Sequence, residues 1–302
     1  MAVQTVSDAP VAGPPLGDVD LGRTRGRALR SLLRNPMGVV GMILLLVVVV
    51  IAVFAPLLAP YSPTQVHFDT PFQRVGTKGF WLGTDDLGRD IMSRAFYGAR
   101  ASLQVGVLSV GLAIVLGAPL GLISGYWRWL DSIVSRLTDL MLAFPFLIIA
   151  VGLAAINGAS LANAAIALGI AQIPTMIRVV RAETLRWKES DFILSARALD
   201  ASSLRILGQH ILPNAASAII VQATVIMPMA IIGEATLSFL GLGITPPSPS
   251  LGIMLSDAQQ YIFRSPAAAV IPGLAIVVIC LGFNFFGDAL RDALDPTTSS
   301  RR

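Results

Sequence analysis

Long apolar runs alternate with short polar segments along most of this chain. A helix needs about 20 apolar residues to cross a bilayer, and each of these runs is long enough to form at least one span. The runs that hold no Asp, Glu, Lys or Arg, or only one, are residues 37–59, 101–127, 140–177, 211–242 and 265–287.

The third run is too long for one span. It extends from Leu140 to Ile177, and Asn157-Gly158 near its middle is a turn signal. We therefore divide it into a third and a fourth helix. The sequence thus predicts an all-α, polytopic membrane protein with six transmembrane helices.

The first run follows a group of arginines, as the apolar region of a signal peptide would. A signal peptide has an apolar region of only about 7–15 residues, whereas 37–59 is long enough to cross a bilayer. We expect 37–59 to be retained as the first transmembrane helix. The preceding arginines are Arg23, Arg25, Arg27, Arg30 and Arg34.

The composition supports a membrane protein. Hydrophobic residues make up 54% of the chain and charged residues only 13%, against about 25% charged residues in soluble domains. The single cysteine, Cys280, excludes an intrachain disulfide framework and a cysteine metal cluster. The pI of 9.7 could suggest nucleic acid, but the arginines lie between apolar runs, as a topology signal would. We expect no nucleic-acid partner.

Positive charge predicts the orientation. Sixteen of the 22 Lys and Arg residues lie in the tail 1–36, the turn 127–136, segment 178–210 and the C-terminal end, and the other six lie in 60–100 and 243–266. Excess Lys and Arg mark the cytoplasmic side. Both termini and segment 178–210 are therefore predicted to be cytoplasmic, and 60–100 is predicted to be an extracytoplasmic loop.

Few motifs or side chains point to chemistry within the membrane. The chain has no GxxxxGK[ST], HExxH or GxSxG motif and only two histidines, so the sequence predicts no enzyme activity, metal site or cofactor. The intramembrane polar candidates are Asp139, Glu234 and Asn284. A charge within the bilayer is a functional candidate by default, but we favour the alternative that each acid pairs with a neighbouring helix or a partner subunit. An ion-coupled secondary transporter remains the alternative of a different class.

Glycines recur at four-residue spacing in the second run, at Gly117, Gly121 and Gly125. Small residues let membrane helices approach closely. We interpret these residues as helix packing, with kinks that line a pathway as the alternative.

One polar segment needs a separate explanation. Residues 192–214, FILSARALDASSLRILGQHILPN, lie between two apolar runs. A simple connection between spans would not need so long a segment with helical character. We expect two short helices that meet at a turn, where Asp200 tolerates left-handed geometry and Asp200 or Ser202 caps the second helix. A soluble partner would dock on this turn.

The same segment resembles the cytoplasmic coupling segment, or EAA loop, of bacterial ABC importer permeases. The match lies at 196–199, Ala201 and 210–214, while Leu194 and Asp200 stand where the family has glutamate and glycine. The resemblance implies that segment 188–210 contacts an ATPase. The residues expected at this contact are Ser195, Ala196, Arg197, Leu199, Asp200, Ala201 and Arg205.

Three further stretches narrow the family. Residues 81–103, 234–243 and 283–296 resemble the dipeptide, oligopeptide and nickel permeases, and the likeness runs from about residue 30 to 296. The chain is similar to their C-type permease subunit and is therefore expected to have the type I ABC importer permease fold. The implied division is a cytoplasmic tail 1–36, a first helix 37–59, an extracytoplasmic loop 60–100, a five-helix core 101–290 and a cytoplasmic tail 291–302.

The resemblance also implies partners and a location. These are a second, nonidentical permease, one or two ABC ATPase subunits, an extracytoplasmic binding protein and membrane lipid, in the bacterial inner membrane. We expect dipeptides or oligopeptides as substrates, with nickel or another small solute as the alternative.

The stretch WLGTDDLGRD forms part of the predicted extracytoplasmic loop. Its acids could suggest a calcium loop, but their spacing does not fit an EF-hand. A surface for the binding protein and a structural loop that holds the first two spans both fit the sequence. The residues singled out are Trp81, Gly83, Asp85, Asp86, Gly88, Arg89 and Asp90.

Overall fold

The computed structural model of the protein describes residues 32–294, and 1–31 and 295–302 lie outside the description. Most of the predicted tail 1–36 and the greater part of 291–302 therefore lie outside the described residues. The described chain is almost entirely helical. It contains only two isolated β-bridges, both in the segment between the first two spans, and no sheet.

Six spans are present if one bent pair of helices counts as a single span. Within residues 32–294, five stretches are long and apolar enough to cross a bilayer alone, and α5 (Arg128–Leu142) and α6 (Phe146–Asn157) qualify together with a bend of 88° between them. The third predicted span, from residue 140 to Asn157, corresponds to α6 and the last residues of α5, and the predicted turn 127–136 is wrong because α5 begins at Arg128. The other spans are α2 (Pro36–Val53), α4 (Ile91–Tyr126), α7 (Leu161–Lys188), α10 (Leu212–Phe239) and α12 (Ala267–Leu294).

Several helix ends differ from those expected from hydropathy. Helix α4 begins inside the predicted loop 60–100, α7 continues into the predicted polar segment as far as Lys188, and α12 continues past residue 290. The first span is interrupted at Phe54 and resumes as α3 (Ala55–Leu58). Hydropathy indicates contact with lipid, whereas helical hydrogen bonding continues through polar turns beyond the lipid. The predicted break at Asn157-Gly158 agrees with the structure, because α6 ends at Asn157.

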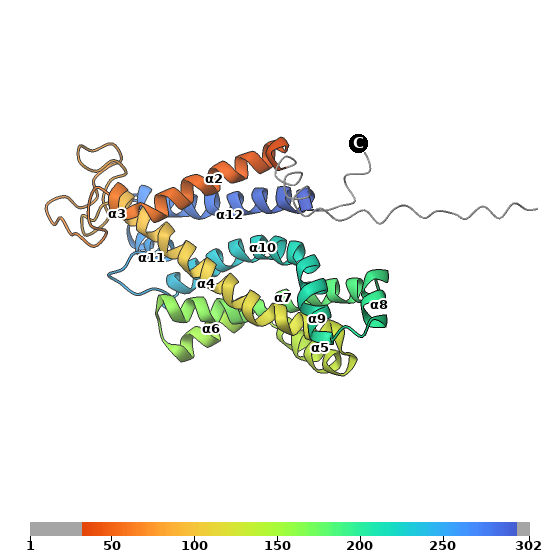
Figure 1. Ribbon diagram of the computed structural model, residues 1–302. Coiled ribbons are helices and arrows are strands. Elements are labelled where there is room, and N and C mark those ends of the chain that lie inside the picture. The colour runs from red at the N-terminus through yellow and green to blue at the C-terminus, as the bar shows by residue number, and fades with distance from the viewer. Residues whose placement is uncertain (1–31, 295–302) are drawn as a thin grey trace, which may run out of the picture.

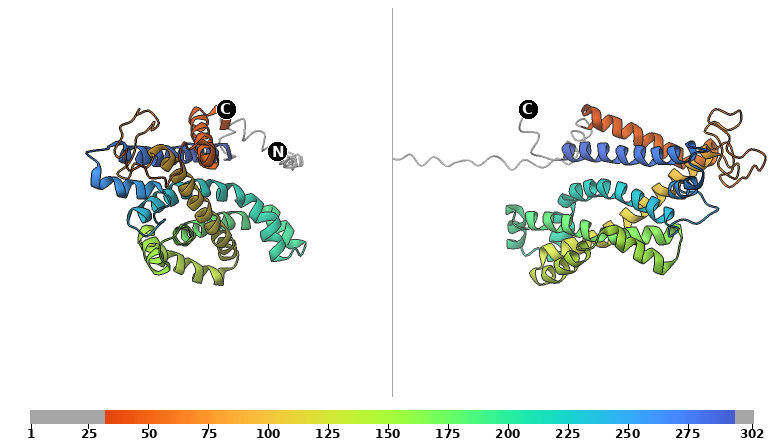
Figure 2. Two further views of the ribbon diagram at one scale, coloured as in Figure 1. Left: turned by 90° about the vertical axis from the view of Figure 1, so that its left-hand side faces the viewer. Right: turned by 180° about the vertical axis from the view of Figure 1, so that it is seen from behind.

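The helices form an elongated bundle with two distinct ends (Figure 1). One end, here called the α8 end, carries α8 (Asp191–Ala198), α9 (Ser203–Arg205), the start of α2 and the end of α12. The opposite end, the loop end, carries the segment 59–90 and α11 (Leu251–Ala258). Helix α2 packs against α12, and α4 crosses the bundle obliquely between the two ends. The view from behind shows the same separation (Figure 2).

A short helical element at the loop end was not expected. Helix α11 and the 3₁₀ turn η2 (Gln259–Tyr261) lie within 243–266, a segment for which the sequence predicted no helix. Ser250 caps α11 by accepting a hydrogen bond from the Ile253 backbone N–H at 3.1 Å. Helix α11 has only about two turns and follows Pro246-Pro247, so its short apolar pattern does not predict a helix.

Glycines hold α4 and α7 together along much of their length. A Cβ atom added at Gly117, Gly121 or Gly125 would lie 2.8, 2.7 or 2.6 Å from the Cβ atoms of Met176, Val180 and Thr184, respectively. Such distances leave no room for a larger residue. The four-residue glycine spacing therefore serves helix packing, which is one of the two interpretations drawn from the sequence.

The glycine contact predicts a position-dependent cost of adding one methyl group. Gly121→Ala places a methyl group against Val180 and should destabilise the fold by about 1–3 kcal/mol through overpacking. Gly111→Ala is the matched control in the same helix, because no atom lies within 4 Å of its added Cβ. Thermal unfolding of each purified variant in lipid nanodiscs measures the difference. Equal midpoints for the two variants would contradict a tight α4–α7 contact.

Candidate functional site

The predicted coupling segment is a compact helix–turn–helix at the α8 end. Helix α8 ends at Ala198, a turn follows, and the single turn of α9 leads into the π-helix η1 (Ile206–Ile211). This π-helix runs directly into α10, with Pro213 in the first turn of α10. Pro is tolerated there because the first helical N–H groups need no partner within the helix. The segment is therefore joined without a break to a membrane span.

The turn is a Schellman motif. Asp200 has a φ of 56°, which places it in the left-handed region. Its backbone N–H donates to the Arg197 carbonyl at 3.0 Å, and that of Ala201 donates to the Ala196 carbonyl at 3.1 Å. This is the hydrogen-bond pattern that ends a helix when the next residue is left-handed. The expectation that Asp200 replaces a turn glycine is confirmed.

Of the two residues proposed to cap the second short helix, Ser202 does so. The Ser202 hydroxyl accepts a hydrogen bond from the Arg205 backbone N–H at 3.4 Å. Asp200 instead supplies the left-handed turn, and its side chain is exposed. Ser202 is thus the N-cap, and the turn needs both residues for different reasons.

Buried side chains anchor the segment to the bundle. Ile193, Ile206, Leu207 and Ile211 are buried in the same hydrophobic core as parts of α4 and α7. Tyr126 at the end of α4 packs against this core. The helix–turn–helix is therefore held in place on its inner side.

Two cations add contacts to the end of α4. The Lys188 ammonium donates to the Tyr126 carbonyl at 2.5 Å, and the Arg197 guanidinium lies over the Tyr126 ring at 5.2 Å. Arg197 was expected to face an ATPase. In the structure, it also connects α8 to α4, so it contributes to positioning as well as to the surface.

The outer side of the segment is exposed and partly apolar. Leu199 is 84% exposed and Leu204 78% exposed, and Phe192 and Leu194 of α8 are also exposed. Large apolar side chains exposed in a polar segment are candidates for an interaction surface. We did not single out Leu204 or Phe192, although leucine and phenylalanine in an otherwise polar segment were a visible signal.

The residues expected to contact an ATPase divide into two groups. Ala196 and Ala201 are half-buried and hold the turn together through their backbone hydrogen bond. The remaining members are exposed and available to a partner: Ser195, Arg197, Leu199, Asp200 and Arg205.

At the loop end, Asp85 is the centre of an ion-pair network. Its Oδ1 accepts the backbone N–H groups of Leu87 at 3.0 Å and Arg89 at 2.9 Å, and its Oδ2 accepts Arg89 Nε and Arg94 Nη1, both at 2.6 Å. Both arginines also reach Asp257 in α11, at 3.4 and 3.3 Å. The network joins the loop, the start of α4 and α11.

The other members of WLGTDDLGRD shape the loop. Asp90 caps α4 by accepting the Ser93 backbone N–H at 2.8 Å. Gly83 and Gly88 have positive φ angles, and a Cβ at either would collide with a backbone carbonyl oxygen at 2.3 or 1.9 Å. A structural role explains these residues, while Trp81 and Asp86 remain at the surface.

Glu234 is fully buried among hydroxyl groups. Ser102 of α4 donates to its carboxyl group at 2.6 Å and Ser238 donates to the other oxygen at 2.8 Å. Ser238 also accepts the Ile244 backbone N–H at 3.1 Å. The carboxyl group thus connects α4, α10 and the turn that follows α10.

Asp139 and Asn284, the other intramembrane candidates, have surroundings that differ from those of Glu234. Asp139 is exposed and pairs with Arg178 at 2.9 Å, while Arg181 of the same helix pairs with Asp131. Asn284 is exposed beside a small cavity of about 50 Å³ between α10 and α12. For Asp139, pairing with a neighbouring helix is the interpretation that the structure supports.

Comparison with known proteins gives matches over nearly the whole chain. A family model described as binding-protein-dependent transport system inner membrane component matches residues 117–300, and one described as the N-terminal TM domain of oligopeptide transport permease C matches 25–74.

Curated relatives cover the same length. The chain is 45% identical to a dipeptide transport system permease protein DppC of Alkalihalophilus pseudofirmus, over 90% of each chain. It is 41% identical to a glutathione transport system permease protein GsiD of Pectobacterium atrosepticum, again over 90% of each chain. A di/tripeptide transport system permease protein DppC of Pseudomonas aeruginosa is 40% identical over 88% of this chain and 90% of its own.

A solved structure shares the fold. A chain of the MetNI methionine ABC transporter, in an inward-facing conformation, matches with a TM-score of 0.55 over 68% of this chain and 98% of that chain. The sequence identity is 19%, so this likeness shows the fold alone.

The hydroxyl contacts of Glu234 predict which substitutions the fold tolerates. Glu234→Gln keeps an acceptor for Ser102 and a polar partner for Ser238, so we expect a small loss of stability. Glu234→Leu leaves both buried hydroxyl groups without this partner and should cost about 1–3 kcal/mol. Thermal unfolding in nanodiscs compares the two. If Gln destabilised the protein as much as Leu, hydrogen bonding would not be what Glu234 supplies.

Proposed function

Because the chain belongs to the family of binding-protein-dependent transport system inner membrane components, we propose that its α8 end docks on a separate ATPase during the import of dipeptides and oligopeptides. The family is established by a match over more than half of the chain and by relatives of 40–45% identity. The docking surface, the orientation and the peptide substrates are the parts that we propose.

The family defines the general role. The chain is a multi-pass permease component of an ABC importer in the cytoplasmic membrane, and it is not itself catalytic. ATP hydrolysis is carried out by a separate subunit, and further partners complete the importer. A self-sufficient ion-coupled transporter, the alternative from another class, is not supported.

The observation that carries the docking proposal is the exposed apolar turn on a rigid support. Leu199 and Leu204 project from a turn that is closed by a Schellman motif and anchored by buried isoleucines. A fixed turn with exposed leucines suits insertion into an apolar groove of a soluble protein, because burial of these side chains removes apolar surface from water. Leu194, which stands where the family has glutamate, adds a further exposed apolar side chain to α8.

The connections of the segment suggest how motion reaches the membrane. Its C-terminal side continues through η1 into α10, and its inner side is fixed to the ends of α4 and α7. A displacement of the turn would therefore move three spans together. The buried carboxyl group of Glu234 then connects α10 back to α4 near the loop end.

The charge distribution supports a cytoplasmic α8 end. Sixteen of the 22 Lys and Arg residues belong to segments that we assign to this side, in agreement with the positive-inside rule. The loop end would then face outward. The remaining proposed partners are a second permease beside this one and an extracytoplasmic binding protein at the loop end.

The substrate proposal is supported by the relatives. Those compared above are described as permeases for dipeptides, di/tripeptides or glutathione. All of these are small peptide-like solutes, and we propose the same class here.

The exposed leucine of the turn gives a direct test. Leu199→Asp places a charge on the proposed docking surface and should lower ATP-dependent dipeptide uptake at least about tenfold, together with the amount of ATPase that copurifies. Burial of an unpaired charge at an interface is the physical reason. Uptake is measured in proteoliposomes with the binding protein supplied and ATP as the energy source.

Val75→Asp is the matched control, because Val75 is 58% exposed in the segment at the loop end. It should leave the ATPase bound. Full uptake and normal copurification by Leu199→Asp would rule out the proposed docking surface.

A further inference from the structure

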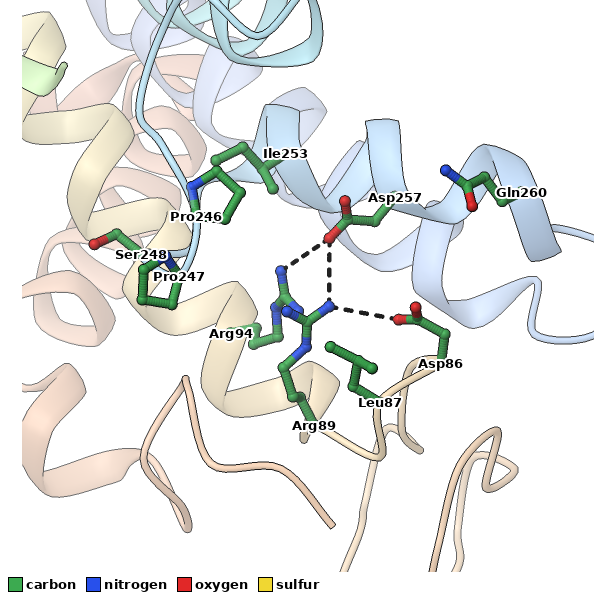
Figure 3. A pocket seen from close by; sticks show the side chains of 10 residues that line it. All are labelled: Asp86, Leu87, Arg89, Arg94, Pro246, Pro247, Ser248, Ile253, Asp257 and Gln260. Carbon is green, nitrogen blue, oxygen red and sulfur yellow. Dashed lines mark hydrogen bonds and ion pairs between the residues drawn. The ribbon is translucent and has the colours of Figure 1, made fainter. Parts of the chain in front are cut away.

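A cavity opens at the loop end between α11 and the start of α4 (Figure 3). Its volume is about 190 Å³. One wall is apolar and is formed by Pro246, Pro247 and Ile253, and the other is polar and is formed by charged side chains and Gln260. Small-molecule ligand pockets measure about 300–1,000 Å³, so this cavity suits a single side chain better than a whole peptide.

The charged residues that line the cavity, Asp86, Arg89, Arg94 and Asp257, balance, and the buried Asp85 behind the arginines brings the whole network to a net charge of −1. Arg89 and Arg94 contribute two positive charges, and Asp85, Asp86 and Asp257 contribute three negative ones. Both arginines are already paired with Asp85 at 2.6 Å. Asp85 balances one of the two positive charges, and the other is shared by Asp86 and Asp257, so these two exposed acids hold a surplus of one negative charge.

The environment of Tyr261 agrees with a negative charge on this network. Burial raises the pKa of the Tyr261 phenol, and the carboxylates of Asp85, Asp86 and Asp257 raise it further, while Arg94 opposes them. The three acids thus outweigh the arginine at a neighbouring position on η2.

Carboxylate oxygens remain available to an incoming group. Asp86 and Asp257 are 40% and 34% exposed, and their contacts to the arginines are long, at 3.3–3.4 Å. Each uses one carboxylate oxygen for these contacts, and among the described residues the other oxygen accepts no hydrogen bond. In Figure 3, dashed lines connect the guanidinium groups with Asp257 above them and with Asp86 to their right, and Gln260 lines the same cavity.

We propose that this cavity receives a basic side chain of the extracytoplasmic binding protein. The aliphatic stem of a lysine or arginine would lie along Pro246, Pro247 and Ile253, while its cationic end reaches Asp86 and Asp257. Such side chains commonly bury the stem and place the charge at a polar rim. The location at the loop end, opposite the proposed ATPase surface, is where a binding protein has access.

This inference rests on the proposed function, since it requires a binding protein that delivers substrate at the loop end. The family description, binding-protein-dependent transport, supports a partner of this kind. The inference adds which residues receive that partner and which charge the partner carries.

The test is a charge reversal at the more exposed acid. The complete transporter is reconstituted in nanodiscs, and the Kd of the purified binding protein is measured at low and high salt. Asp86→Lys should raise the Kd about tenfold at low salt, because an attraction becomes a repulsion, and the effect should shrink at high salt through screening. Asp69→Lys is the matched control, because Asp69 is also exposed in segment 59–90 and does not line the cavity.

Reciprocal reversal identifies the partner residue. Basic residues of the binding protein are replaced by Glu one at a time, and one of them should restore binding to Asp86→Lys. If Asp86→Lys does not assemble, Asp86→Asn makes the same comparison with a smaller expected increase in Kd, about threefold.

The outcomes separate this inference from the proposed function. A binding protein that fails to bind or stimulate the wild-type transporter would contradict the proposed function. If the binding protein stimulates ATP hydrolysis by the wild-type transporter and has the same Kd for wild type and Asp86→Lys, the inference alone would be overturned. A lower Kd for Asp86→Lys would show that the cavity receives an acidic group instead.

Discussion

The close packing of α4 against α7 is the contact on which the other parts of the structure depend. Gly117, Gly121 and Gly125 let the two helix backbones meet where any larger residue would collide. In a bilayer, lipid is as apolar as the helix surfaces, so such close van der Waals packing is a main source of helix association. The contact also fixes the ends of both helices, which carry the functional surfaces.

Helix α4 connects these surfaces. At the loop end, its start is capped by Asp90 and joined to α11 through Arg94. At the other end, Tyr126 contacts Lys188 and Arg197 of the coupling segment. Glu234 adds a third connection, from α10 to α4, by hydrogen bonds that are fully buried. The proposed ATPase surface and the proposed binding-protein cavity thus lie at opposite ends of one connected set of helices.

The sequence predicts those features that depend on local pattern. Apolar length indicates the spans, Asn157-Gly158 marks a break, and Asp200 is read correctly as a left-handed turn residue because its neighbours define the turn. Features that depend on tertiary contact are not predicted. The start of α4 depends on a cap by Asp90, α11 is too short to show a period, and the partner of Glu234 is Ser102, 132 residues away. Leu204 was overlooked because apolar residues in a polar segment are usually buried, whereas here the anchoring is done by Ile206 and Leu207.

The central claim is that the turn at Leu199 touches the ATPase while the loop end does not. The most direct measurement places a photo-crosslinking amino acid at Leu199 or, separately, at Val75 in cells that express the complete importer. The account predicts an adduct with the ATPase subunit from Leu199 and none from Val75. An ATPase adduct from Val75, or the absence of one from Leu199 in an assembled importer, would contradict it.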